Sequence, residues 1–121
     1  MSERKRSDAA TGPAGERQAA FDRSAVALIA GALGVEPERL PLSVPGREVY
    51  QLILPDRHGR AQTLVTLWPW IGRVDLVAGA ATIIVTGVVM IRAGMSGDVT
   101  FCRRNGETVV LGRDGRVVAR I

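Results

Sequence analysis

The segment "LVAGAATIIVTGVVMI" (residues 76–91) contains no charged side chain, and its conformation decides how the rest of the chain folds. A membrane-spanning helix needs about 20 apolar residues, with a practical minimum of about 17. This segment has sixteen residues between Asp75 and Arg92. β-branched residues dominate its second half, which favours a β-strand in a globular protein. A membrane-anchored protein with a span near 76–91 remains an alternative hypothesis to the strand interpretation.

The strand interpretation divides the segment into a turn and one long strand. The small residues "VAGAA" (77–81) suit a turn, and "TIIVTGVVMI" (82–91) then forms the strand. Both faces of that strand are largely apolar, which is typical of a central strand that is covered on both sides. One cover is the core of the domain, and the other is either an N-terminal helix or another protein chain. Gly87 predicts a bulge, a bend or a close backbone approach in mid-strand.

The sequence on both sides of this segment predicts antiparallel strands. Upstream, strand-like runs cover 47–54, 61–68 and 71–77, and the first two are joined by the turn "PDRHGR". Downstream, Asn105-Gly106 and Asp114-Gly115 have the composition of tight hairpin turns and connect three further strands. We therefore expect about six or seven strands in a mainly antiparallel sheet or a small barrel.

One helix is expected before these strands, at residues 22–33. Val26 and Ile29 belong to an apolar face at helical spacing, and Asp22 or Ser24 can cap the start of the helix. The fold class is therefore α+β, with an N-terminal helix followed by the strands.

The first 20 residues are polar, charged and without an apolar period. We therefore expect a disordered tail at 1–20 and a single α+β domain at 21–121. The one cysteine excludes an internal disulfide and is compatible with the reducing cytosol, so a cytoplasmic location is expected.

The chain is basic, with a net charge of +4, and almost all of its basic residues are arginines. Five arginines of the C-terminal strands are the candidate binding residues: Arg103, Arg104, Arg113, Arg116 and Arg120. The simpler interpretation is a solvated sheet face whose charges protect its edges. The functional interpretation is a basic docking face for an acidic protein or for RNA. Aromatic residues make up only 4% of the chain, which is a thin supply of stacking platforms for nucleic acid.

The sequence contains no recognisable catalytic set. His58 is the only histidine and lies in a turn, and Cys102 has no second cysteine with which to bind zinc. We therefore expect a non-enzymatic binding module without a cofactor or metal. Its partner is expected to be a protein or a second copy of the chain, and RNA binding is the alternative.

Overall fold

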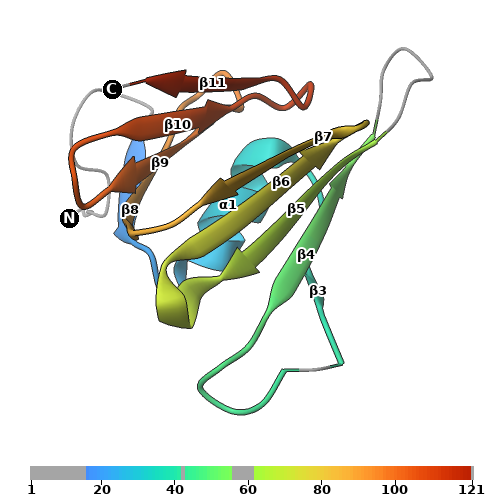
Figure 1. Ribbon diagram of the computed structural model, residues 1–121, viewed down its shortest axis with the longest axis vertical. Coiled ribbons are helices and arrows are strands. Elements are labelled where there is room, and N and C mark those ends of the chain that lie inside the picture. Colours follow the sequence, from blue (N-terminus) through green and yellow to red (C-terminus); the bar gives the residue numbers. More distant parts are fainter. Residues whose placement is uncertain (1–15, 42, 56–61, 121) are drawn as a thin grey trace, which may run out of the picture.

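The computed structural model describes residues 16–41, 43–55 and 62–120, which form two antiparallel sheets and one helix (Figure 1). The mainly antiparallel fold is confirmed. The ten described strands exceed the six or seven expected. The helix α1 (Ala25–Leu33) begins later than the expected range of 22–33.

The strands of the first sheet, here called the β3–β7 sheet, follow one another in chain order. They are β3 (Glu38–Arg39), β4 (Tyr50–Leu54), β5 (Thr63–Trp68), β6 (Arg73–Ala78) and β7 (Ala81–Val85). A short 3₁₀ helix, η1 (Pro69–Ile71), joins β5 to β6.

The second sheet, here called the β8–β11 sheet, has the strand order β11-β10-β9-β8-β2. Its strands are β2 (Arg17–Ala20), β8 (Val88–Ala93), β9 (Val99–Arg103), β10 (Thr108–Leu111) and β11 (Val117–Arg120). The hairpin turns predicted between β9 and β10 and between β10 and β11 are both present, and Gly106 and Gly115 adopt positive φ there.

The prediction of a single strand at 82–91 is wrong, because this range contains parts of two strands that belong to different sheets. β7 ends at Val85, β8 begins at Val88, and Thr86 and Gly87 link them. Gly87 has φ +69°, a left-handed conformation that favours glycine and interrupts an extended strand. The bend expected at Gly87 is present, but the sequence does not predict that the chain changes sheet there. The turn expected at 77–81 is present as the tight β6–β7 hairpin, in which Ala78 pairs with Ala81.

The boundary of the predicted tail also differs from the structure. Residues 17–20, expected in the tail, form β2, which pairs with β8 through Ala19 and Ile91. A four-residue strand has too short a pattern to be recognised in sequence, and its pairing depends on the neighbouring edge of β8. Residues 1–15 of the expected tail lie outside the described residues.

The start of α1 is fixed by a local turn. Asp22 accepts hydrogen bonds from the backbone N–H of Ser24 at 2.9 Å and from the Ser24 hydroxyl at 2.5 Å. The hydroxyl bond is the main cause that lowers the pKa of the Asp22 carboxyl. Ser24 is the residue that precedes the helix, but its side chain makes no hydrogen bond to the first turn of α1.

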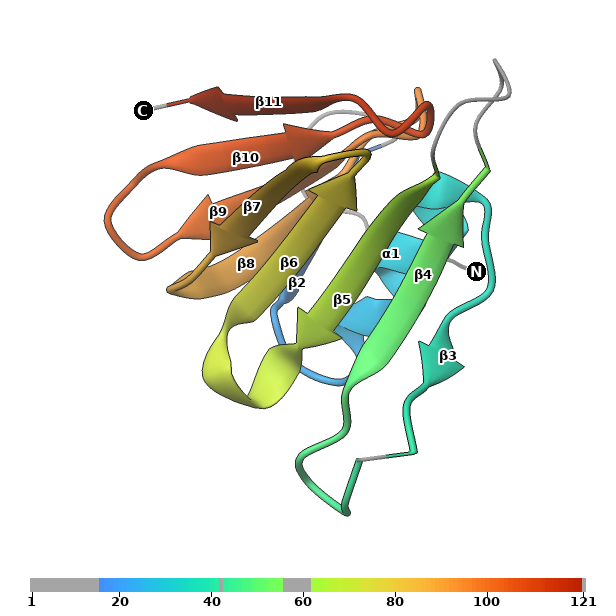
Figure 2. The same ribbon diagram turned by 45° about the vertical axis from the view of Figure 1, so that its right-hand side comes forward.

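The helix and the inner faces of both sheets form one hydrophobic core. α1 lies behind the β3–β7 sheet, where it contacts β4, and it also contacts β8, β9 and β2 of the other sheet (Figures 1 and 2). Burial of each large apolar side chain contributes about 1.5–3 kcal/mol. The largest buried side chains of the helix and the two sheets include Ile29, Leu33, Leu52, Leu67, Leu76, Ile91, Phe101 and Leu111.

The two sheets are joined by backbone hydrogen bonds at the Thr86-Gly87 link, here called the crossover. The Val88 N–H donates to the Gly72 carbonyl at 2.9 Å, and the Arg104 N–H donates to the Gly87 carbonyl at 2.7 Å. Gly72 itself has φ +66°, and a Cβ at this position would lie 2.8 Å from the Val88 carbonyl oxygen. The close approach of η1 to β8 therefore requires glycine at position 72.

We predict that Gly72→Ala destabilises the protein by more than about 1–2 kcal/mol, the cost of a left-handed alanine, because the new methyl group also collides with β8. Gly31→Ala is the control, since Gly31 lies in α1 with no atom within 4 Å of a new Cβ. This control is expected to gain roughly 0.5–1 kcal/mol. Urea denaturation measures both, and equal stabilities of the two variants would contradict the role assigned to Gly72.

Candidate functional site

The candidate arginines do not share one surface, because they lie near the two opposite ends of β10 (Figure 1). Arg103 and Arg104 are at the β9–β10 turn, whereas Arg113 and Arg116 are at the β10–β11 turn. The backbone of Arg120 pairs with Thr108 and therefore lies near the first of these turns. The side chain of Arg120 is outside the described part of the structure.

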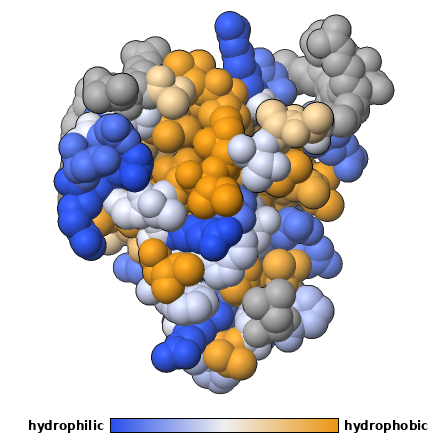
Figure 3. Space-filling view, in the orientation of Figure 1, coloured by the Kyte–Doolittle hydropathy of each residue, from blue (hydrophilic) through white to orange (hydrophobic). Residues whose placement is uncertain are grey.

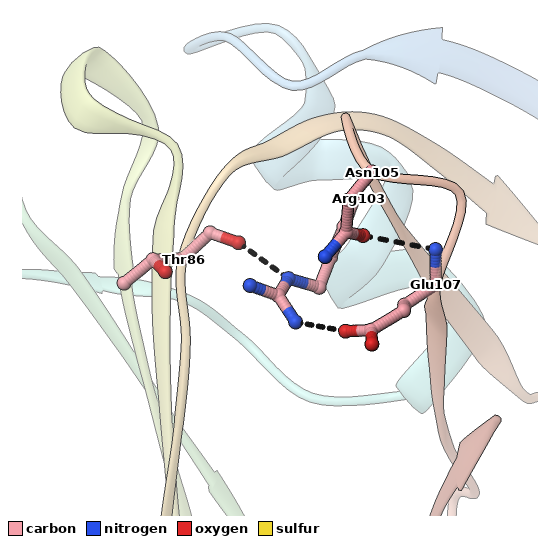
Figure 4. A network of polar contacts seen from close by, with 4 residues as sticks. All are labelled: Thr86, Arg103, Asn105 and Glu107. Atoms are coloured by element: carbon pink, nitrogen blue, oxygen red, sulfur yellow. Dashed lines mark hydrogen bonds and ion pairs between the residues drawn. The ribbon is translucent and has the colours of Figure 1, made fainter. Parts of the chain in front are cut away.

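Arg103 serves as a structural clamp at the crossover (Figure 4). Its Nε donates to the Thr86 carbonyl at 2.7 Å, and its guanidinium forms an ion pair with Glu107. The Glu107 N–H in turn donates to the Asn105 side-chain oxygen at 3.0 Å. These contacts tie the β9–β10 turn to the link between the sheets, so the charge of Arg103 is already satisfied within the domain.

Arg113 has a comparable structural role at the other end of β10. Its guanidinium donates to the Ala32 carbonyl near the C-terminal end of α1, at 2.9 Å from one terminal nitrogen and 3.2 Å from Nε. The last carbonyls of a helix lack partners within the helix and carry partial negative charge, so a cation stabilises them. Arg113 thereby attaches the helix to the β10–β11 turn.

Arg104, Arg113 and Arg116 are all exposed, but Arg113 is bonded to the Ala32 carbonyl, which leaves Arg104 and Arg116 to consider. Neither guanidinium makes a hydrogen bond or an ion pair to any residue in the described ranges. Their backbones are nevertheless fixed, since the Arg104 N–H bonds to Gly87 and the Arg116 N–H bonds to the Asp114 carboxylate at 3.0 Å. These two cations are therefore available to a ligand, one at each end of β10.

β7 is an edge strand of the β3–β7 sheet. Its side chains are uncharged, and Ile84 and Ile83 are 55% and 38% exposed. Within the described ranges β7 pairs only with β6, in a register that opposes Ala81 to Ala78 and Ile83 to Leu76. Antiparallel strands alternate between residues that bond to the neighbour and residues that point away from it. A two-residue hairpin closes on a bonded pair, so the backbones of Thr82 and Ile84 point toward the open edge.

Beside this edge, the inner face of β11 is not fully buried. Ala119 and Val117 of β11 share the inner face with Val109 and Leu111, their partners on β10. Val109 and Leu111 are buried, but Val117 is only partly buried and Ala119 is exposed. β11 lies beyond β7 on the side away from β6 (Figures 1 and 2). The apolar area in Figure 3 extends over β7 and the adjoining part of the β8–β11 sheet. The β3–β7 sheet thus ends before it covers β11.

A shallow pocket of about 430 Å³ lies at the crossover, next to the end of β7. Trp70, Ile71 and Val89 line it and are 40–49% exposed, and Arg104 stands at the same pocket. Arg47 lies over the Trp70 ring, 5.6 Å from its centroid. The sequence alone gives no sign that Trp70 and Arg104 meet, because they are far apart in the chain and come together only through the crossover. The apolar surface beside β7 therefore continues past the crossover.

Of the two residues considered for chemistry, the structure describes only Cys102. Cys102 is partly buried on the outer face of β9, opposite Met90 and Thr108, and His58 lies outside the described residues. No group of His, Cys, Asp and Glu among the described residues could hold a metal ion. In the described ranges, no helix has the length and apolar content needed to cross a membrane, and residues 76–91 belong to β6, β7, β8 and their connections.

We predict that Arg103→Ala lowers the free energy of unfolding by about 1–2 kcal/mol, because the Thr86 carbonyl and Glu107 lose a charged hydrogen-bond donor. Arg104→Ala, at the adjacent position, should change stability by less than about 0.5 kcal/mol, as expected for a surface side chain. Thermal unfolding of the two variants distinguishes the clamp from the solvent-exposed arginine. A destabilisation of equal size in both would show that this division is wrong.

Comparisons with known proteins found no matching family model, no similar curated protein and no similar solved structure.

Proposed function

We propose that this protein is a small non-enzymatic module that binds an extended segment of a partner protein along β7. The observation that carries the proposal is the uncharged edge of β7, which lies where the inner face of β11 is uncovered. An added strand there would extend the β3–β7 sheet over β11. Strand addition of this kind supplies affinity through main-chain hydrogen bonds and specificity through alternate side chains.

The geometry of β7 supports an antiparallel partner strand centred on Ile83. The N–H and carbonyl groups of Thr82 and Ile84 would form the main-chain hydrogen bonds to the partner, each with a net value of roughly 0.5–1.5 kcal/mol. Apolar side chains on the inner face of the partner would cover Ile83, Val117 and Ala119. Binding would therefore combine backbone pairing with burial of apolar surface that is now in water.

RNA binding through a broad arginine face receives less support from the geometry. Arg103 and Arg113 bond to carbonyl oxygens of the domain, and Arg104 and Arg116 lie at opposite ends of β10. A nucleic-acid surface usually concentrates its cations in one patch or stripe.

We predict that Thr82→Pro abolishes partner binding while the domain stays folded. Proline removes the N–H of residue 82, which points to the open edge, and leaves the hydrogen bonds between β6 and β7 intact. Ile84→Lys should also reduce binding at least tenfold by placing a charge on the edge. Ile53→Lys is the matched control, because Ile53 is 42% exposed on the same outer face of the same sheet.

The measurement is a native pull-down with quantitative mass spectrometry, in which the four proteins are compared side by side. Support requires a partner that the wild type and Ile53→Lys retain and that both β7 variants lose. Equal retention by wild type and Thr82→Pro would contradict the proposal, as would the absence of any retained partner. Light scattering at several concentrations shows whether the retained partner is a second copy of the chain.

A further inference from the structure

We infer that the segment bound by β7 is acidic on both sides of a short uncharged centre. The inference rests on the proposed strand addition and specifies its partner. It derives from the positions of Arg104 and Arg116, the two exposed candidate arginines whose guanidinium groups make no bond within the described ranges, relative to the two ends of β7.

The first arginine stands at the C-terminal end of β7. β7 ends at Val85, and the Gly87 carbonyl two residues later accepts the N–H of Arg104. The clamp from Arg103 to the Thr86 carbonyl fixes the same turn from the other side. Arg104 is therefore held beside the point at which a strand paired with β7 would enter or leave. Glu107, the acid of this turn, is already engaged by Arg103.

The second arginine stands near the N-terminal end of β7. The β10–β11 turn packs against β5, since a Cβ on Gly115 would lie 2.6 Å from the Thr63 hydroxyl oxygen. Thr63 pairs with Ala78, which in turn pairs with Ala81 at the start of β7. Arg116 follows Gly115 directly, so its backbone lies at the end of the β3–β7 sheet where β7 begins. The Asp114 carboxylate accepts the backbone N–H of Arg116. The Arg116 side chain is exposed, and its guanidinium makes no hydrogen bond or ion pair within the described ranges.

The spacing of these ends sets the length of the uncharged centre. Five residues, Ala81–Val85, lie between them and carry no charge. At about 3.4 Å per residue in an antiparallel strand, they span about 17 Å. A partner with about five apolar or small polar residues, preceded and followed by Asp or Glu, would pair with β7 and place a carboxylate near each arginine. Arginine suits this role because its planar guanidinium matches a carboxylate with two hydrogen bonds.

The same arrangement disfavours a second copy of the chain on this edge. Two copies of β7 that pair as antiparallel strands are related by a two-fold axis, which brings the C-terminal end of one strand beside the N-terminal end of the other. Arg104 of each copy would then stand near Arg116 of its partner. Like charges that face each other across an interface are repulsive, whereas an acidic segment turns both ends into attractive contacts.

The test is a selection of random twelve-residue peptides on the intact protein, followed by fluorescence anisotropy of the enriched peptides. We expect enriched peptides to carry acidic residues on both sides of an uncharged centre and to lose at least tenfold in affinity with Thr82→Pro. The double variant Arg104→Glu/Arg116→Glu should reverse the preference toward basic flanks. The control variant Arg23→Glu/Arg39→Glu makes the same change in net charge at two other exposed arginines and should keep the acidic preference.

Each contrary result has a distinct meaning. Peptides that depend on Thr82 but have no acidic preference would overturn this inference and leave the proposed function standing. The absence of any peptide that depends on Thr82 would overturn both. If the control variant lost as much affinity as the double variant, net charge alone would explain the effect, and the inference would be overturned. Binding of mixed-sequence RNA that needs Arg104 and Arg116 but not Thr82 would replace the peptide with nucleic acid.

Discussion

The change of sheet at Thr86 and Gly87 is the constraint on which the rest of the fold depends. The left-handed backbone of Gly87 interrupts the apolar run between β7 and β8, and the two strands belong to different sheets. Three contacts hold the change of sheet in place: Val88 to Gly72, Arg104 to Gly87, and the Arg103 side chain to Thr86. In each contact a backbone carbonyl accepts a hydrogen bond that, in a regular sheet, a neighbouring strand would donate. The crossover is thus held by hydrogen bonds that take the place of those between paired strands.

The crossover also explains why β7 has an open side. A strand that continued into β8 would bring the two sheets into one ladder, but the bend directs β8 to pair with β9 and β2 instead. The inner face of β7 still contributes Val85 to the core, while Ile83 remains partly exposed because nothing in the described ranges covers the edge. The apolar side chains of β7 therefore suit both burial in the core and a position at an open edge.

The sequence predicted the local features of this fold better than the long-range ones. Asn105-Gly106, Asp114-Gly115 and the small residues at 77–81 mark turns through their own backbone preferences, so their positions were recognised. The β2 pairing and the sheet that β8 joins depend on partners far away in the chain. Gly87 marks the bend within residues 82–91 locally, but it does not indicate a change of sheet. The candidate site followed the same rule. Alternation placed the arginines on strands and turns, but which of them meet a carbonyl acceptor is decided by packing, as for Arg113 and Ala32.

The edge strand β7 differs from the other edge strands of the two sheets in its charge. Open edges invite unwanted pairing, and proteins commonly protect them with charged residues or with very short strands. The other edge strands fit this pattern: β2 contains Arg17, β3 has only the two residues Glu38 and Arg39, and β11 contains Arg120. β7 has no such charge, although arginines stand at both of its ends. Charges beside an edge oppose self-pairing and attract an acidic strand, whereas a charge within the edge would prevent pairing altogether. An edge that is left uncharged between two cations is therefore protected against copies of itself and remains open to an acidic partner.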